Sequence, residues 1–243
     1  MTVNGEILHN HSHKNILKDG KLLLHDGGAE SKLHYATDIT RTFPVSGKFT
    51  SIQKTIYEIV LNMQETVIGK ISSGVKYKDM HLLASKICIE GLKSVGLMKG
   101  NAEDALQAGA HALFFPHGLG HMLGLDVHDM EALGEDNIGY NSEEKRDSQF
   151  GISYLRLGKE LDCGNVLTVE PGIYFIPTLI DQWGQKEKHR EFINYASLES
   201  FKKFGGIRIE DNILVTNNGC INLSVSIPKS ISEIEQIVGS GSN

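Results

Sequence analysis

The chain has 243 residues, of which 40% are hydrophobic and 22% are charged, a balance typical of a globular protein with a sizeable core. Its formal net charge of −6 argues against a nucleic-acid-binding protein. The N-terminus lacks the apolar segment of a secretory signal, and no apolar run reaches the roughly 18 residues of a membrane helix. Because the three cysteines lie far apart, we expect reduced thiols in a cytoplasmic protein.

The first half of the chain predicts a β-hairpin followed by two helices. Residues 21–28 form a short apolar strand pattern that ends in a turn, and residues 34–45 alternate well enough for a second strand. Apolar residues then recur at helical spacing over 50–71, where Thr50 or its neighbour can cap the helix, and again over 77–96.

The second half predicts irregular polar segments between two further strands. Residues 100–116 predict a short helix, and residues 131–160 predict a polar surface excursion. Strand patterns rich in β-formers cover 165–176 and 205–216, and the charged stretch between them predicts an insertion or an exposed helix. Because no repeat or composition break divides the chain, we expect one α+β domain over residues 1–243.

Several carboxylates fall inside these apolar strand patterns, where acids are seldom buried unless they are paired or bind a metal. They are Asp26, Asp38, Glu170 and Glu210. Any one of them could mark a strand end near water, but together with the histidine-rich stretch HGLGHMLGLDVHD at 117–129 they indicate one site. If the hairpin turns around Lys32, its two aspartates lie opposite each other, with Cβ atoms about 4.5–5.5 Å apart.

Charge repulsion between these acids favours bound cations. Two carboxylates 4 Å apart repel by about 4 kcal/mol at an effective dielectric near 20, whereas a whole domain has only about 5–15 kcal/mol of net stability. Two divalent cations would balance four negative charges and leave a neutral imidazole as a further ligand. Oxygen donors with a single imidazole suit Mn²⁺ best, although Zn²⁺, Co²⁺ or Fe²⁺ would also bind.

The motifs of this chain resemble those of the creatinase, prolidase and methionine-aminopeptidase superfamily. The resemblance rests on DGGAE, YATDITRTFPVSGKF, HGLGHMLGLDVHD, LTVEPGIY and GIRIEDNILVT, which occur in this order over nearly the whole chain. It implies the pita-bread fold, a curved antiparallel sheet covered by helices. Within the superfamily, the histidine-rich motif looks like the proline-specific aminopeptidase P branch rather than the methionine aminopeptidases.

The resemblance implies a dinuclear metal centre with five protein ligands. Asp26 is expected to be a terminal chelator, and Asp38 and Glu210 are expected to bridge the two ions. His121 and Glu170 are expected to bind the second ion.

The same resemblance implies roles for residues around the ligands. His9, His117 and His128 are expected to contact the substrate or transfer protons. Arg208 is expected to contact a ligand carboxylate and orient it without binding the metal. The implied reaction is cleavage of the bond before a proline at position two of a peptide. In it Glu170 accepts a proton from the attacking water, while a histidine stabilises the oxyanion or protonates the leaving nitrogen. A purely structural role for either His117 or His128 is the alternative.

Two features depart from the usual pattern of the family. The interval from Asp26 to Asp38 is one residue longer, so a longer turn or a β-bulge must absorb it if Asp38 is to face the site. His9 lies only 17 residues before Asp26. We therefore expect the N-terminal domain and the start of the catalytic domain to be missing, with strand edges and apolar patches exposed.

Three other functions stay open. The chain could belong to a prolidase acting on Xaa-Pro dipeptides, or to a catalytically dead binding module of the same fold. A metal-free hydrolase resembling creatinase is disfavoured because all five ligand positions are filled. In its longer form the protein is expected to be a homodimer that takes a peptide with penultimate proline.

Overall fold

The computed structural model describes residues 1–7, 14–238 and 240. His9 therefore lies outside the described residues. Within them, the strands form three antiparallel sheets, with orders β1-β2-β3, β4-β7-β8 and β5-β6. The strands are β1 (Thr2–Val3), β2 (Leu22–Gly27), β3 (Ile39–Pro44), β4 (Val166–Val169), β5 (Gly172–Tyr174), β6 (Gly206–Arg208), β7 (Asp211–Thr216) and β8 (Gly219–Asn222).

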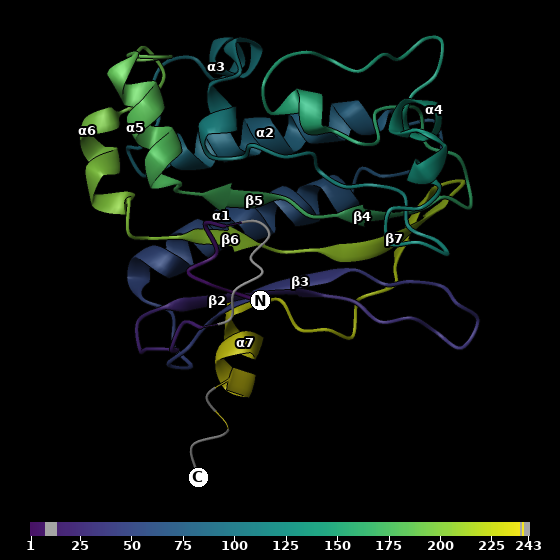
Figure 1. Cartoon of the computed structure of the whole chain (residues 1–243), viewed down its shortest axis with the longest axis horizontal. Coiled ribbons are helices and arrows are strands. Elements are labelled where there is room, and N and C mark those ends of the chain that lie inside the picture. The colour runs from purple at the N-terminus through teal and green to yellow at the C-terminus, as the bar shows by residue number, and fades with distance from the viewer. Residues whose placement is uncertain (8–13, 239, 241–243) are drawn as a thin grey trace.

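The two long strands predicted in the second half are each divided in two. The break between β4 and β5 falls at Glu170 and Pro171, and the break between β6 and β7 falls at Ile209 and Glu210. Figure 1 shows β5 and β4 in one line, β6 and β7 in a second line beside it, and β2 and β3 beyond these. The two predicted acidic ligands of this half therefore lie at strand breaks, where the ladder no longer fixes their side chains.

The predicted hairpin forms, but its register differs from the prediction. Asp26 pairs with Thr40, and the hairpin turns around Leu33 instead of Lys32. The loop closes through a hydrogen bond from the Ser31 amide to the Tyr35 carbonyl at 2.8 Å. Asp38 is therefore displaced by two residues from the position opposite Asp26, and since side chains alternate with period two it keeps the same face.

The two predicted long helices are α1 (Ser51–Ile68) and α2 (Tyr77–Ser94). Thr50 caps α1 in a capping box with Gln53, as its sequence indicates. Their apolar faces bury residues such as Ile56, Val60 and Leu92 in the main core. Because α1 contacts α2 and also β4, β5 and β6, the two helices form a layer against the strands (Figure 1).

The remaining helices are short: α3 (Ala102–Ala108), α4 (Glu135–Gly139), α5 (Pro177–Gln185), α6 (Tyr195–Leu198) and α7 (Ile231–Val238). The predicted insertion between the last strand patterns contains α5 and α6, which bury Trp183 and Leu198. In the part of the chain that the structure describes, no helix has the length and apolar character needed to cross a membrane. The α+β class predicted from the sequence is confirmed.

Candidate metal centre

The structure brings all five predicted metal ligands to the wall of one cavity of about 710 Å³. His117, His128 and Arg208 line the same cavity. Of the predicted site residues, only His9 cannot be placed, because it lies outside the described residues. Residues separated by nearly two hundred positions therefore line the same cavity.

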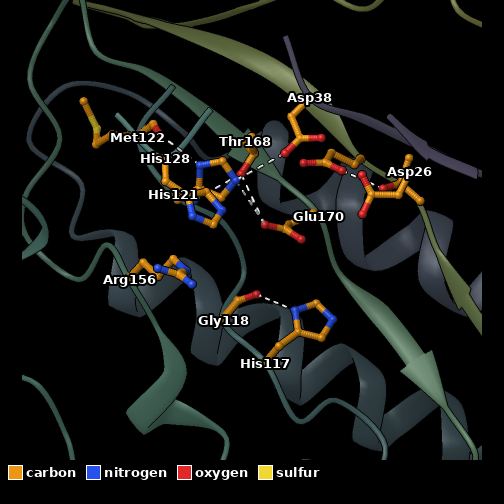
Figure 2. Close-up of polar contacts among 12 residues, drawn as sticks. Asp26, Asp38, His117, Gly118, His121, Met122, His128, Arg156, Thr168 and Glu170 are labelled. Carbon is orange, nitrogen blue, oxygen red and sulfur yellow. Dashed lines mark hydrogen bonds and ion pairs between the residues drawn. The ribbon is translucent and has the colours of Figure 1, made fainter. Parts of the chain in front are cut away.

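His121 presents one ring nitrogen to the acids. Its Nδ1 lies 2.9 Å from the carbonyl oxygen of Met122, which can only accept, so Nδ1 carries the hydrogen and Nε2 carries a lone pair. Nε2 lies 3.6 Å from Asp38 Oδ2 and 3.7 Å from Glu170 Oε1 (Figure 2). Both separations are longer than a hydrogen bond, which leaves room for an ion between the three groups.

Glu210 contributes a buried oxygen that lacks a partner. Its amide donates to the Thr40 carbonyl at 3.0 Å, and its Oε2 accepts from the Thr40 hydroxyl at 2.6 Å. Its Oε1 is buried and has no hydrogen-bond partner among the described atoms. Since buried polar atoms are almost always paired, this oxygen suits a cation.

The pKa shifts of the acids also favour a bound cation. Burial, reinforced by the charges of Glu170 and Asp38, raises the pKa of Glu210 well above its usual value. Burial also raises the pKa of Glu170 to about 7. Burial acts to raise the pKa of Asp38 as well, but the nearby His121 in its protonated form outweighs it, with help from Arg208, and lowers that pKa. These acids cannot all ionise together without positive charge between them.

The donor set fits a divalent cation. One ligand atom each from Asp38, His121 and Glu210 lie within 4.8 Å of one another. Two atoms that each bind one ion at about 2.1 Å lie roughly 3–4 Å apart, which matches the separations measured from His121. Asp26 and Glu170 extend this group with further carboxylate oxygens on the same cavity wall.

Arg208 links the carboxylates to His117 through a tyrosine. The Arg208 side chain is buried and donates to the Asp26 carboxylate, to the Thr40 hydroxyl at 3.1 Å and to the Tyr174 hydroxyl at 3.0 Å. The Tyr174 hydroxyl lies 2.9 Å from His117 Nε2, while His117 Nδ1 lies 2.7 Å from the Gly118 carbonyl. Because that carbonyl accepts from Nδ1, Tyr174 donates to Nε2. Sequence reasoning missed Tyr174, although it lies four residues after Glu170 in the same strand pattern.

His128 stands at the exposed edge of the centre. Its ring contacts the ring of His121 edge-on, with centroids 4.3 Å apart, and its Nδ1 lies 3.5 Å from Glu131 Oε2. Burial, with the charges of His121 and Arg156, lowers the pKa of His128 to about 4. Arg156 donates to the same Glu131 oxygen at 2.5 Å and lines the cavity. The segment that we predicted as a surface excursion thus supplies part of the cavity wall.

The fold and this group of acids and histidine define a metallopeptidase of family M24. Residues 1–217 match that family, and the chain belongs to it. Its fold is the pita-bread fold of the family, as the sequence predicted.

Among the members of that family, the chain is similar to Xaa-Pro aminopeptidases. It is 46% identical over 221 residues to a probable Xaa-Pro aminopeptidase of Botryotinia fuckeliana, covering 90% of this chain and 46% of that protein. It is 42% identical over 238 residues to a probable Xaa-Pro aminopeptidase of Phaeosphaeria nodorum, covering 98% of this chain and 49% of that protein.

The chain is also similar in structure to solved aminopeptidase P enzymes. A variant of Escherichia coli aminopeptidase P superposes with a TM-score of 0.75 at 36% identity, covering 98% of this chain and 46% of that one. The zinc-substituted Escherichia coli enzyme in complex with product superposes with a TM-score of 0.74 and the same identity and coverage. The chain thus spans about half the length of the relatives that it matches.

Proposed function

We propose that this chain carries the catalytic centre of a dinuclear metallo-aminopeptidase that removes the first residue from peptides with proline at position two. The observation that carries the proposal is the convergence of His121 Nε2 and several carboxylates, one with an unpartnered buried oxygen, on a single cavity. The names of the relatives support the substrate class. A cytoplasmic location and a homodimer of the longer protein stay predictions.

The four acids and the one imidazole would hold two divalent ions, with Asp26 as a terminal ligand and Asp38 and Glu210 shared by both ions. His121 and Glu170 would complete the second position. The hardness of this donor set favours Mn²⁺. When bound, the ions supply Lewis acidity toward the scissile carbonyl and a water that ionises near neutral pH.

The remaining steps belong to the residues of the chain. Glu170 is placed to take the proton of the attacking water, since its carboxylate lies at the centre. His128, partly exposed at the cavity, would donate to the oxyanion or to the leaving proline nitrogen, and His117, which lines the same cavity, would contact the substrate. Arg208 holds Asp26 through a charged hydrogen bond, and this keeps the terminal ligand in place.

Hydrolysis of two peptides tests the proposal. The chain is incubated with Mn²⁺ and an Xaa-Pro-Xaa tripeptide, and separately with an Xaa-Pro dipeptide, and release of the first residue is measured. We expect cleavage of the tripeptide, its abolition in Asp38→Ala, and its retention in Asp162→Ala, a control that removes an exposed aspartate. Cleavage of the dipeptide alone would indicate a prolidase. Absence of both metal binding and turnover would favour a binding module and contradict the proposal.

A further inference from the structure

The segment 38–42, formed by Asp38 and the first part of β3, runs antiparallel to the β6–β7 segment without forming a regular ladder with it. We call the boundary between these two segments the seam. Three residue pairs face each other across it, at every second residue, in antiparallel order. The pairs are Thr42 with Arg208, Thr40 with Glu210, and Asp38 with Asn212. Among the described residues, one main-chain hydrogen bond crosses the seam, from the Glu210 amide to the Thr40 carbonyl.

Side chains take the place of the missing main-chain bonds at the two ends of the seam. The Thr42 hydroxyl accepts from the Arg208 amide at 3.1 Å and donates to the Arg208 carbonyl at 2.9 Å. At the other end, Asn212 Oδ1 accepts from the Asp38 amide at 3.2 Å, and Asn212 Nδ2 donates to the Asp38 carbonyl at 2.6 Å. Both main-chain groups of Asp38 are therefore bound by one side chain.

Asp38 depends on this contact because the β2–β3 ladder does not reach it. The ladder pairs Gly27 with Ile39 and ends there, and the hairpin loop follows. The main-chain groups of Asp38 are partly buried, and leaving such groups without partners would cost up to about 1–3 kcal/mol and would free the peptide to rotate. The side-chain amide of Asn212 pairs both main-chain groups of Asp38 and restrains the rotation of the backbone there. It thereby fixes the direction in which the Asp38 side chain points.

Asn212 is itself held firmly. It lies within β7 and is almost fully buried. Its backbone N–H donates to the Ser224 hydroxyl at 2.9 Å. Its partner across the β4–β7 ladder is Thr168, whose hydroxyl accepts from the His121 amide at 3.0 Å. The paired residues Asn212 and Thr168 thus each bind the backbone of a candidate ligand. The Asn212 side chain binds Asp38, and the Thr168 side chain binds His121.

We propose that Asn212 is a positioning residue: its amide side chain replaces an absent strand neighbour and aims the Asp38 carboxylate at the space shared with His121 and Glu210. The inference rests on the metal centre of the proposed function. It places the support of Asp38 in β7 and not in the hairpin loop.

Metal binding by the whole chain without peptide tests the inference. The chain, Asn212→Leu and Asn212→Asp are titrated with Mn²⁺ and with Co²⁺, and stoichiometry, affinity and the visible absorption of Co²⁺ are recorded. Asn212→Leu removes both hydrogen bonds at similar volume, whereas Asn212→Asp keeps an acceptor for the Asp38 amide, replaces the donor with an oxygen and adds a carboxyl group. Asn194→Leu is the matched control, because it makes the same replacement at an asparagine whose side-chain amide also donates to a main-chain carbonyl, that of Gly96, and that does not line the cavity.

We expect both Asn212 variants to bind metal about 10–100-fold more weakly, the range seen when a group that orients a ligand is lost, and to change the Co²⁺ spectrum. Asn194→Leu should lower the melting temperature and keep both metal properties. If Asn212→Leu does not fold, the Asp variant decides. Unchanged affinity and spectrum in the folded Asn212 variants would overturn the inference, and so would an equal loss in Asn194→Leu. A wild-type chain that binds no metal would instead remove the proposed function.

Discussion

Two buried histidines should make this fold sensitive to acid. His81 lies on α2 and His111 lies in the 3₁₀ turn Ala110–Leu113, both with no exposed surface and with ring centroids 6.2 Å apart. None of their four ring nitrogens has a hydrogen-bond partner among the described atoms. Burial lowers the pKa of His111 to about 4, and it lowers the pKa of His81 well below its usual value, with the charge of His111 acting in the same direction.

The sign of the effect follows from proton binding. An unfolded histidine has a pKa near 6.5, so between pH 6.5 and about 4 the unfolded chain binds a proton that folded His111 does not. The contribution of His111 to stability is therefore full above pH 6.5 and is lost as the pH falls toward 4. At pH 5 the loss is about 2 kcal/mol, since each pH unit in this window is worth about 1.4 kcal/mol. His81 acts in the same direction.

Urea unfolding at pH 8 and pH 5, with a chelator present so that metal binding does not contribute, measures this loss. In His111→Leu the difference in unfolding free energy between the two pH values should shrink by about 2 kcal/mol, because the titrating group is gone. The control His25→Gln replaces an exposed histidine and should leave the difference unchanged. Equal pH dependence in the wild type and His111→Leu would refute the reasoning.

Three further substitutions test other parts of the structure. Thr50→Ala removes the capping box of α1 and should lower the unfolding free energy by about 1 kcal/mol in urea; no change would contradict the assigned cap. Gly120→Ala places a Cβ 2.1 Å from the Thr168 carbonyl oxygen, so it should destabilise the chain by about 1–3 kcal/mol and weaken Mn²⁺ binding, measured by calorimetry. Tyr174→Phe leaves a buried Arg208 donor unpaired and should cost about 1–3 kcal/mol in chemical unfolding; wild-type stability would show that the hydroxyl is dispensable.

The parts of the fold that local sequence determines were predicted well. The helices α1 and α2 form within a few residues of the predicted ranges, because their apolar residues repeat with the helical period. The strand segments within 165–176 and 205–216 were also predicted, but the breaks in them at Glu170 and Glu210 were not. At those points the chain leaves one ladder for another, which depends on contacts between distant segments.

The error in the hairpin has a similar cause. The hairpin register was wrong because the loop conformation decided it, including a left-handed His34 with φ of 65° that residue spacing does not reveal.

The candidate ligands were predictable because acids and histidines are rare in apolar strands. Asn212 and Tyr174 were not, because an asparagine at a strand start and a tyrosine within a strand have ordinary structural explanations. Their contacts with Asp38 and His117 arise only when separate strands meet.

The metal content of the purified chain tests the central claim most directly. The apoprotein is saturated with Mn²⁺, unbound metal is removed, and the metal-to-protein ratio is measured for the wild type, Asp38→Ala and Asp162→Ala. Convergence of the acids and His121 on two ions predicts two equivalents in the wild type and in Asp162→Ala, and one or fewer in Asp38→Ala. A wild-type chain without bound metal, or an Asp38→Ala chain that keeps two equivalents, would contradict it.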